Sequence, residues 1–280
     1  MAEQVPFIKD PAYVERLLDV CRRHDVRIVI PLIDLDLERL APHIEEFADI
    51  GTTVLCASPD IVDLCFDKAR FAAFCRANDL EQAPYYALDD LPTATFPVFY
   101  KRRRGFGSIG SGVCQSIVDA RRLHEHAPDT LFQRLVNAPE LSVDAYISLR
   151  SQCIVCVPRT RDKVVAGESY KSRTVPSGSV SELARRAIDA LARAGLRGPL
   201  NLQIFATSPP SLIEVNARLG SAAVLSNMAV GGRLLDAVLT EACGNVAHGD
   251  PDEYIAGMSL TRFLGDVFHN GPDVVGLFPG

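Results

Sequence analysis

The sequence predicts an α/β protein in two parts, a short parallel α/β module over residues 1–66 and a larger α+β domain over residues 67–280. Helical and strand-like segments alternate in the first part, which favours parallel strands joined by helices. In the second part strands cluster without regular alternation, which favours an α+β arrangement. Hydrophobic residues make up 48% of the chain, enough for a sizeable core, so a wholly disordered chain is excluded.

The first part is short for a parallel module. Its apolar spacing predicts helices over 11–24 and 35–50 and strands over 27–32 and 52–56, with a further strand around 4–6. A parallel sheet needs cover on both faces. This module is therefore expected to pack either against the rest of the chain or against another subunit.

The second part begins with a helix and continues mainly with strands. Helices are expected over 67–78, 119–126, 181–194 and 234–242. Strands are expected over 96–104, 113–118, 131–134, 141–149, 153–158, 163–166, 200–205, 211–215 and 258–264.

Charge and hydropathy exclude two classes of partner. The net charge is −6, whereas a nucleic-acid-binding protein would usually be basic. No apolar run approaches the roughly 18 to 20 residues of a membrane span, and the first ten residues do not form a signal peptide. We expect a cytoplasmic protein with neither nucleic acid nor a membrane as partner.

The eight cysteines are expected to be small buried hydrophobes. Cys153 and Cys156 form a C-x-x-C, but they lie in an apolar stretch typical of a strand. Odd spacing in a strand points two side chains to opposite faces. We therefore expect no zinc or redox site there.

A glycine-rich loop over residues 105–110 matches G-x-G-x-x-G. A dinucleotide-binding loop would open directly into a helix, but here a glycine and β-branched stretch follows, so the loop joins two strands. Its backbone N–H groups suit a phosphate cradle, and residues 101–104 directly before it are all basic. An ordinary surface hairpin with a solvated basic face is the alternative.

A second constellation lies on the strand around residue 214. Alternation puts Glu214, Asn216 and Arg218 on one face, with Ile213 and Val215 toward the core. Gln203 comes beside Glu214 if the two strands pair across the Ser-Pro-Pro turn. These oxygens suit Mg²⁺ with phosphate, and the guanidinium suits a γ-phosphate. The alternative is a surface pair of Glu214 with Arg218.

Taken together and in this order, the motifs resemble the ATP-grasp superfamily, in its carbamoyl-phosphate-synthase large-chain-like, carboxylate–amine ligase group. The stretches that carry the resemblance are 65–69, 96–101 with the glycine loop, 131–136, 140–144, 201–203 and 213–218. The resemblance implies an ATP-grasp fold of two α+β subdomains, 67–132 and 133–280, that clamp ATP. It also implies that residues 1–66 form a truncated Rossmann-like module.

The resemblance implies a full set of nucleotide contacts. The residues expected to bind ATP are Lys68 and Lys101 at the phosphates, Gly105, Gly107, Ser108 and Gly110 in the mobile loop, Gln133, Arg134, Leu135 and Val136 at the adenine hinge, and Glu140 at the ribose. The residues expected to hold Mg²⁺ are Gln203, Glu214 and Asn216. Arg218 and Lys101 are expected to be catalytic, at the transferred phosphoryl group. Arg134 departs from the family, which usually has an acidic residue there.

The implied activity is an ADP-forming ligase that uses ATP and Mg²⁺. It would activate a carboxylate as an acyl phosphate for attack by an amine or similar nucleophile, without a covalent protein nucleophile. Alternatives are a phosphotransferase, and an ATP-binding subunit whose partner completes the N-terminal module.

The substrates are expected to be a small carboxylate and an amine. Glu168 is expected to hold the amine and Arg173 or Arg159 the carboxylate, against the alternative of a charged exposed hairpin. The short N-terminal module is expected to leave apolar surface exposed, which favours a homodimer formed through that module.

Overall fold

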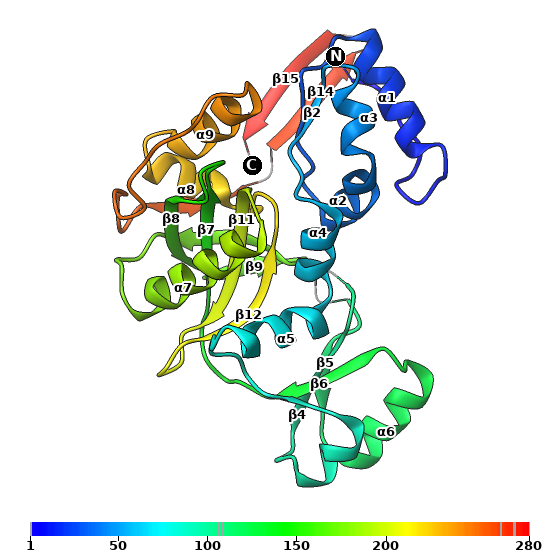
Figure 1. Cartoon of the computed structure of the whole chain (residues 1–280), viewed down its shortest axis with the longest axis vertical. Coiled ribbons are helices and arrows are strands. Elements are labelled where there is room, and N and C mark those ends of the chain that lie inside the picture. The colour runs from blue at the N-terminus through cyan, green and yellow to red at the C-terminus, as the bar shows by residue number, and fades with distance from the viewer. Residues whose placement is uncertain (1, 106, 108, 264, 271–272, 280) are drawn as a thin grey trace.

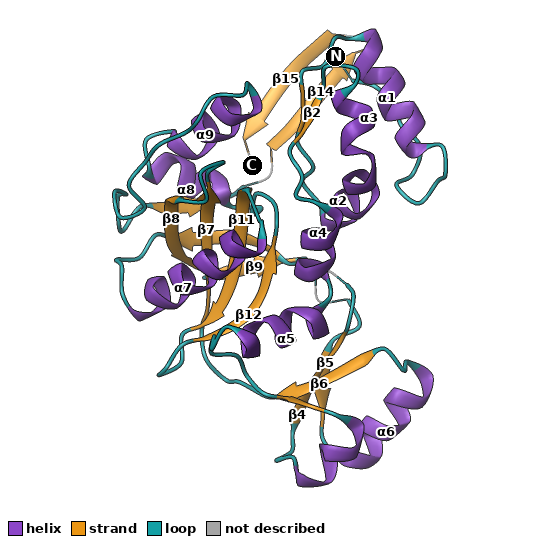
Figure 2. Ribbon diagram, viewed as in Figure 1, coloured by secondary structure: helices purple, strands orange, loops and turns teal. Residues whose placement is uncertain are grey.

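The computed structural model describes residues 2–105, 107, 109–263, 265–270 and 273–279 (Figure 1). An N-terminal α/β module comes first, and a small sheet with one helix lies at the opposite end of the molecule. A larger sheet with helices on both of its faces lies between them (Figure 2). The expected α/β module followed by an α+β domain is confirmed.

The N-terminal module holds a parallel pair of strands between helices, as predicted. Its elements are α1 (Tyr13–Arg23), β1 (Ile28–Val29), α2 (Asp34–Leu40), a 3₁₀ turn (Ala41–His43), α3 (Ile44–Ala48) and β2 (Thr53–Val54). The single helix expected over 35–50 is wrong: Pro42, which has no N–H to donate, lies in the 3₁₀ turn that separates α2 from α3. The strand expected around 4–6 is also wrong, although Val5 packs against the core of this module.

Two helices lead from the module into the second part of the chain. Helix α4 (Pro59–Phe66) was not predicted, although a proline stands in its first turn, a favoured position. The helix expected from residue 67 is α5 (Lys68–Ala77). The Asp67 carboxylate caps α5 by accepting hydrogen bonds from the N–H groups of Ala69 and Arg70.

The small sheet has the strand order β3-β6-β4-β5 and is covered by α6. Its elements are β3 (Tyr85–Tyr86), a 3₁₀ turn (Leu88–Thr93), β4 (Val98–Arg102), β5 (Gly112–Cys114), α6 (Ile117–His126) and β6 (Thr130–Arg134). Strands β4 and β5 are antiparallel and flank the glycine loop, so the predicted strand–loop–strand arrangement is confirmed. Strand β5 is shorter than expected because Ser116 caps α6, accepting a hydrogen bond from the Asp119 N–H.

The larger sheet is antiparallel, with the order β12-β11-β7-β8. Its elements are β7 (Glu140–Ile147), β8 (Cys153–Thr160), β11 (Gly198–Phe205) and β12 (Ser211–Asn216). One face packs against α4, α5 and α7 (Ser179–Ala194), and the other against α8 (Ala223–Ala229) and α9 (Arg233–Ala242). Helix α8 was not predicted.

Two further sheets complete the fold. One has the order β13-β10-β9 and contains β9 (Lys163–Val165), β10 (Glu168–Arg173) and β13 (Ser259–Thr261). Strand β10 was expected only as a charged segment. Strands β14 (Gly265–Asn270) and β15 (Asp273–Pro279) pair with each other. Within the described residues no helix is both long and apolar enough to cross a membrane.

A bulge in β8 overturns one prediction about the cysteines. Ile147 pairs with Cys153 and Tyr146 with Val155, so Ile154 is an extra residue in the strand. As a result Cys153 and Cys156 both pack on the α7 side of the sheet, and the expectation of opposite faces is wrong. The described residues contain no group of three or more His, Cys, Asp or Glu side chains that could hold a metal ion.

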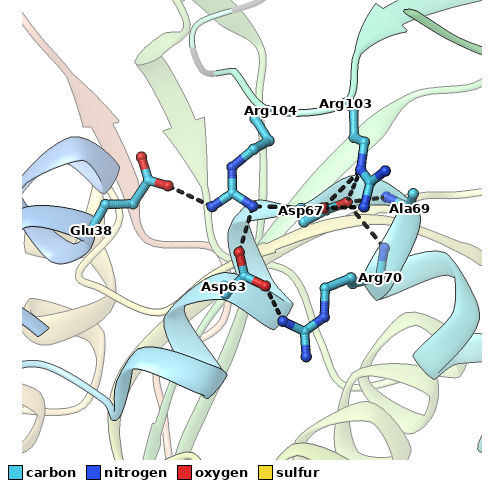
Figure 3. A network of polar contacts seen from close by, with 7 residues as sticks. All are labelled: Glu38, Asp63, Asp67, Ala69, Arg70, Arg103 and Arg104. Carbon is cyan, nitrogen blue, oxygen red and sulfur yellow. Dashed lines mark hydrogen bonds and ion pairs between the residues drawn. The ribbon is translucent and has the colours of Figure 1, made fainter. Parts of the chain in front are cut away.

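An ion-pair network joins three segments that are distant in sequence (Figure 3). The Arg104 guanidinium lies 2.6 Å from the Glu38 carboxylate of α2 and also contacts Asp63 of α4. Arg103 lies 2.7 Å from Asp67. These two arginines were expected to supply charge to the phosphate loop, but they instead fasten the end of β4 to the module and to the α4–α5 corner.

The Asp67 carboxylate both caps α5 and pairs with Arg103, so substitutions of Asp67 should lower the stability of the protein in a fixed order. Asp67→Asn keeps a capping oxygen but loses the charge opposite Arg103, and we expect it to lower the free energy of unfolding by about 1 to 2 kcal/mol. Asp67→Ala also loses the cap and should cost about 1 kcal/mol more. Urea denaturation checks this order, with Glu125→Gln on the exposed side of α6 as the control. Equal stability of the two Asp67 variants would contradict it.

Candidate active site

A cavity of about 360 Å³ lies where the small sheet, the glycine loop and the larger sheet meet. Most of the residues singled out from the sequence line it: Lys68, Lys101, Gly105, Gly107, Gln133, Arg134, Leu135, Val136, Glu140, Gln203, Glu214, Asn216 and Arg218. Gly110 is not among the lining residues, and Ser108 lies outside the described residues. The fold therefore brings together side chains from five separate parts of the chain.

Two lysines enter the cavity from different elements. Lys68 begins α5, and its ammonium donates a hydrogen bond to the Gly105 carbonyl at 2.8 Å while lying 4.0 Å from a Glu214 carboxylate oxygen. Lys101 comes from β4, and its ammonium lies 5.1 Å from the centre of the Tyr85 ring. Burial lowers the pKa of Lys101 to about 8, against the opposing pull of the nearby Glu214 carboxylate. The site thus contains a desolvated cation, which an anionic ligand would stabilise.

The pairing of β11 with β12 sets out a group of oxygen donors. Gln203 lies opposite Glu214 and Asn201 opposite Asn216, so the predicted pairing across the turn is confirmed. Gln203, Glu214 and Asn216 all line the cavity. One carboxylate and two amides are a donor set that suits a hard divalent cation such as Mg²⁺.

A bulge changes the role of one apolar residue on β12. Gln203 pairs with Glu214 while Ile204 pairs with Leu212, so Ile213 is an extra residue between them. Leu212 and Val215 are buried in the core, but Ile213 lines the cavity, which corrects the expectation that it faces the core. The cavity thereby gains an apolar wall beside its polar donors.

Arg218 makes a bidentate ion pair with Asp34, which the sequence did not predict. Its Nε and Nη2 donate to the two carboxylate oxygens of Asp34 at 2.9 and 2.7 Å. Asp34 is the first residue of α2 and is buried in spite of its charge. The alternative of a surface pair between Glu214 and Arg218 is therefore wrong, because the partner of Arg218 comes from the N-terminal module. In the sequence Asp34 is indistinguishable from any acidic residue at a helix start.

The end of β6 and the start of β7 border the cavity on another side. The Gln133 side chain is buried and donates a hydrogen bond to the Ala83 carbonyl at 2.8 Å, which ties β6 to the chain before β3. Leu135 is 37% exposed and offers apolar surface to the cavity. Glu140 begins β7 and lies 3.5 Å from Arg161 Nε.

The glycine loop passes close to the turn between β9 and β10. A Cβ atom added to Gly167 would lie 3.3 Å from the Gly107 Cα, and Gly167 has a φ of +83°. Both the close approach and the backbone conformation favour glycine at this position. The contact brings the loop against the larger half of the site, so the loop covers one side of the cavity.

A second cavity of about 200 Å³ adjoins the first and shares Asp34, Arg161 and Arg218 with it. Glu168 lines it and lies 2.8 Å from Arg262. Arg173 lines neither cavity and donates to Ser259 Oγ at 3.2 Å, so its predicted role in binding substrate is not supported by its position.

A buried polar network forms the floor of this second cavity. Arg159 donates to Asp144 at 2.7 Å, and Asn201 and Ser226 each donate to the same carboxylate at 2.6 Å. Although burial opposes ionisation, these partners hold the pKa of Asp144 below its usual value. A Cβ atom on Gly220 would lie 2.6 Å from Asp144 Oδ1, so a larger residue does not fit there.

The sequence matches the ATP-grasp domain family over residues 65–222, which is more than half of the chain, and the chain belongs to this family. Residues 1–55 match the PylC-like N-terminal domain family. No curated protein matches the sequence.

Solved structures share the fold at low sequence identity. The biotin carboxylase domain of Hydrogenobacter thermophilus 2-oxoglutarate carboxylase, solved as a dimer with MgADP, ADP and bicarbonate, is 15% identical with a TM-score of 0.76. The match covers 90% of this chain and 62% of that one. Campylobacter jejuni biotin carboxylase is 16% identical with a TM-score of 0.74, over 89% of this chain and 61% of that one. Bacillus licheniformis L-amino acid ligase is 14% identical with a TM-score of 0.69, over 95% and 70%. The chain adopts the ATP-grasp fold.

Because burial disfavours the charged form of Lys101, its removal should stabilise the protein. We expect Lys101→Met to raise the free energy of unfolding at pH 7 by about 1 to 3 kcal/mol. The folded-state pKa near 8 lies below the ordinary value of 10.5, so the unfolded state binds more protons between those values. The stability of the parent protein should therefore rise relative to the variant as pH increases through this window.

Urea denaturation of both proteins at pH 7 and pH 9.5 measures this difference. The advantage of Lys101→Met should shrink at the higher pH. A Lys101→Met variant less stable than the parent at pH 7 would show that the contacts of Lys101 outweigh the cost of burying its charge.

Proposed function

We propose that the chain is an ADP-forming ligase that activates a carboxylate as an acyl phosphate for attack by an amine. The observation that carries this proposal is one cavity lined by two lysines, a carboxylate–amide donor set and an arginine. Membership of the ATP-grasp family and the MgADP in a solved relative of the same fold support ATP with Mg²⁺ as the cofactor pair.

In this proposal the nucleotide lies between the small sheet and the larger sheet. Leu135, Val136 and Ile213 offer apolar surface for the adenine, and Glu140 would accept hydrogen bonds from the ribose. Lys68 and Lys101 would neutralise phosphate charge, and the glycine loop would cover the phosphates and keep water from the intermediate. Gln203, Glu214 and Asn216 would hold Mg²⁺, which neutralises phosphate charge when bound.

The reaction proceeds in two displacements. A carboxylate oxygen of the substrate attacks the γ-phosphorus of ATP, the bond to the β-phosphate oxygen breaks, and ADP leaves. The amine nitrogen then attacks the acyl carbon and loses a proton, and inorganic phosphate leaves. Arg218 lines both cavities and is paired with Asp34. If its ion pair with Asp34 opens, the Arg218 guanidinium can stabilise negative charge on the transferred phosphoryl group. Glu168, at the second cavity, is the proposed contact for the amine.

Glu214 is the single carboxylate in the proposed metal-binding set, so its neutralisation tests the assignment. We expect Glu214→Gln to slow ADP release from ATP, over pooled amino acids and simple carboxylates, by about 100-fold or more. Glu182→Gln, on the exposed surface of α7, is the matched control. ADP release that is unchanged in Glu214→Gln would remove Glu214 from the metal site.

The same assay separates the alternative reactions. A phosphorylated product that accumulates and is never consumed by an added amine indicates a phosphotransferase. ATP binding without ADP release from any pool indicates a subunit that needs a partner.

We also propose a homodimer formed through the N-terminal module. Apolar side chains are exposed on this module, including Phe7 at 91% and Ile30 at 37%. Light scattering at micromolar concentration should give about twice the chain mass, and Phe7→Ser should shift the equilibrium toward the monomer. A monomer at that concentration would rule the dimer out.

A further inference from the structure

The second cavity is a ligand-sized space beside the one proposed for the nucleotide. Its volume is about 200 Å³. It shares Arg161, Asn216 and Arg218 with the first cavity, so a molecule held there lies beside the proposed position of phosphoryl transfer. The occupant must be compact and must reach toward the first cavity.

Arg161 is the residue at this junction whose hydrogen bonds are incomplete. Its side chain is 10% exposed. Its two terminal nitrogens donate to the Gly167 carbonyl at 3.2 Å and to Ser142 Oγ at 3.4 Å, both long contacts. Its Nε has no hydrogen-bond acceptor among the described residues, and the nearest carboxylate, that of Glu140, is 3.5 Å away. A buried guanidinium so weakly paired gains much from an added anion.

The two other arginines of this cavity differ from Arg161 in their pairing. Each side-chain nitrogen of Arg159 donates a hydrogen bond to Asp144 or Ser169 in the floor, and Arg159 Nε lies 2.7 Å from the Asp144 carboxylate. Arg218 donates two short hydrogen bonds to Asp34. Among these three, Arg161 has the greatest unused capacity for an incoming carboxylate.

Part of the lining of the second cavity is apolar and comes from the N-terminal module. Leu32 is 60% exposed and Ile33 is 50% exposed, and both line this cavity. Two large exposed apolar side chains at the mouth of a charged site would lose unfavourable contact with water if a ligand covered them. The lining of this cavity therefore includes both a weakly paired cation and an aliphatic surface.

We propose that the second cavity binds the carboxylate substrate as a compact aliphatic acid, with its carboxylate at Arg161 and its hydrocarbon tail against Leu32 and Ile33. This inference rests on the proposed ligase function and names its substrate class. Arg161 is thus a substrate-binding residue, and the N-terminal module sets the preference for the tail.

Isothermal titration in the presence of MgADP tests this directly, with isovalerate, leucine and acetate as probes. We expect isovalerate or leucine to bind at least about tenfold more tightly than acetate, because extra methylene and methyl groups are worth roughly one to two orders of magnitude in an apolar pocket. Tighter binding of leucine identifies an amino acid as the source of the carboxylate, and tighter binding of isovalerate identifies a simple acid. Both outcomes support the proposal.

Separate variants test the cation and the apolar surface of the cavity. Arg161→Gln should weaken all carboxylates at least about tenfold, with Arg161→Lys intermediate and Arg193→Gln, on the exposed end of α7, within about twofold of the parent. The double variant Leu32→Ser, Ile33→Ser should remove the preference for isovalerate over acetate while leaving acetate binding unchanged. An unchanged far-UV circular dichroism spectrum and urea midpoint in each variant would show that the fold is intact.

Three results would overturn the inference: parent-like carboxylate binding by Arg161→Gln, an unchanged isovalerate-to-acetate ratio in the double variant, or no carboxylate binding by a parent protein that binds MgADP. Failure of the parent to bind MgADP at all would instead refute the proposed function. The two hypotheses thus fail in different measurements.

Discussion

The arrangement of the larger sheet depends on the hydrogen bonds and the ion pair that the buried Asp144 carboxylate makes. It lies on β7 and accepts hydrogen bonds from Arg159 of β8, Asn201 of β11 and Ser226 of α8, so it joins three strands and a helix. A buried charge that loses its partner costs several kcal/mol, so these elements cannot shift independently. Gly220 packs against Asp144 Oδ1, where there is no room for a side chain. The floor of the second cavity is therefore held in a single arrangement.

Above this floor, the candidate site combines residues that are close together in the sequence with residues that are far apart in it. The β11–β12 register presents the proposed metal ligands, and the antiparallel pair β4–β5 presents the glycine loop. The ion pairs of Arg104 with Glu38 and Asp63 fasten that loop's strand to the N-terminal module. Isolated exposed pairs contribute little to stability, but a network that crosses three segments also restricts their relative positions.

Sequence patterns predicted the parts of the structure that depend on neighbouring residues. The glycine loop was placed between strands because the residues after it favour a strand, and Gln203 was placed beside Glu214 because a short turn joins their strands. The patterns failed where a single extra residue reverses alternation, as at Ile213 and at Ile154 before Cys156. They also missed Asp34 as the partner of Arg218, because 184 residues separate them and only the folded chain brings them together.

The position of Leu32, Ile33 and Asp34 in the chain makes the lining of the second cavity modular. These residues lie within the 1–55 segment that matches one family, whereas Lys101, Glu214 and Arg218 lie within the 65–222 segment that matches another. One wall of the second cavity thus comes from a different matched segment than the proposed phosphoryl-transfer residues. Substitutions at Leu32 and Ile33 would alter the lining of this cavity without changing any residue of the matched ATP-grasp segment.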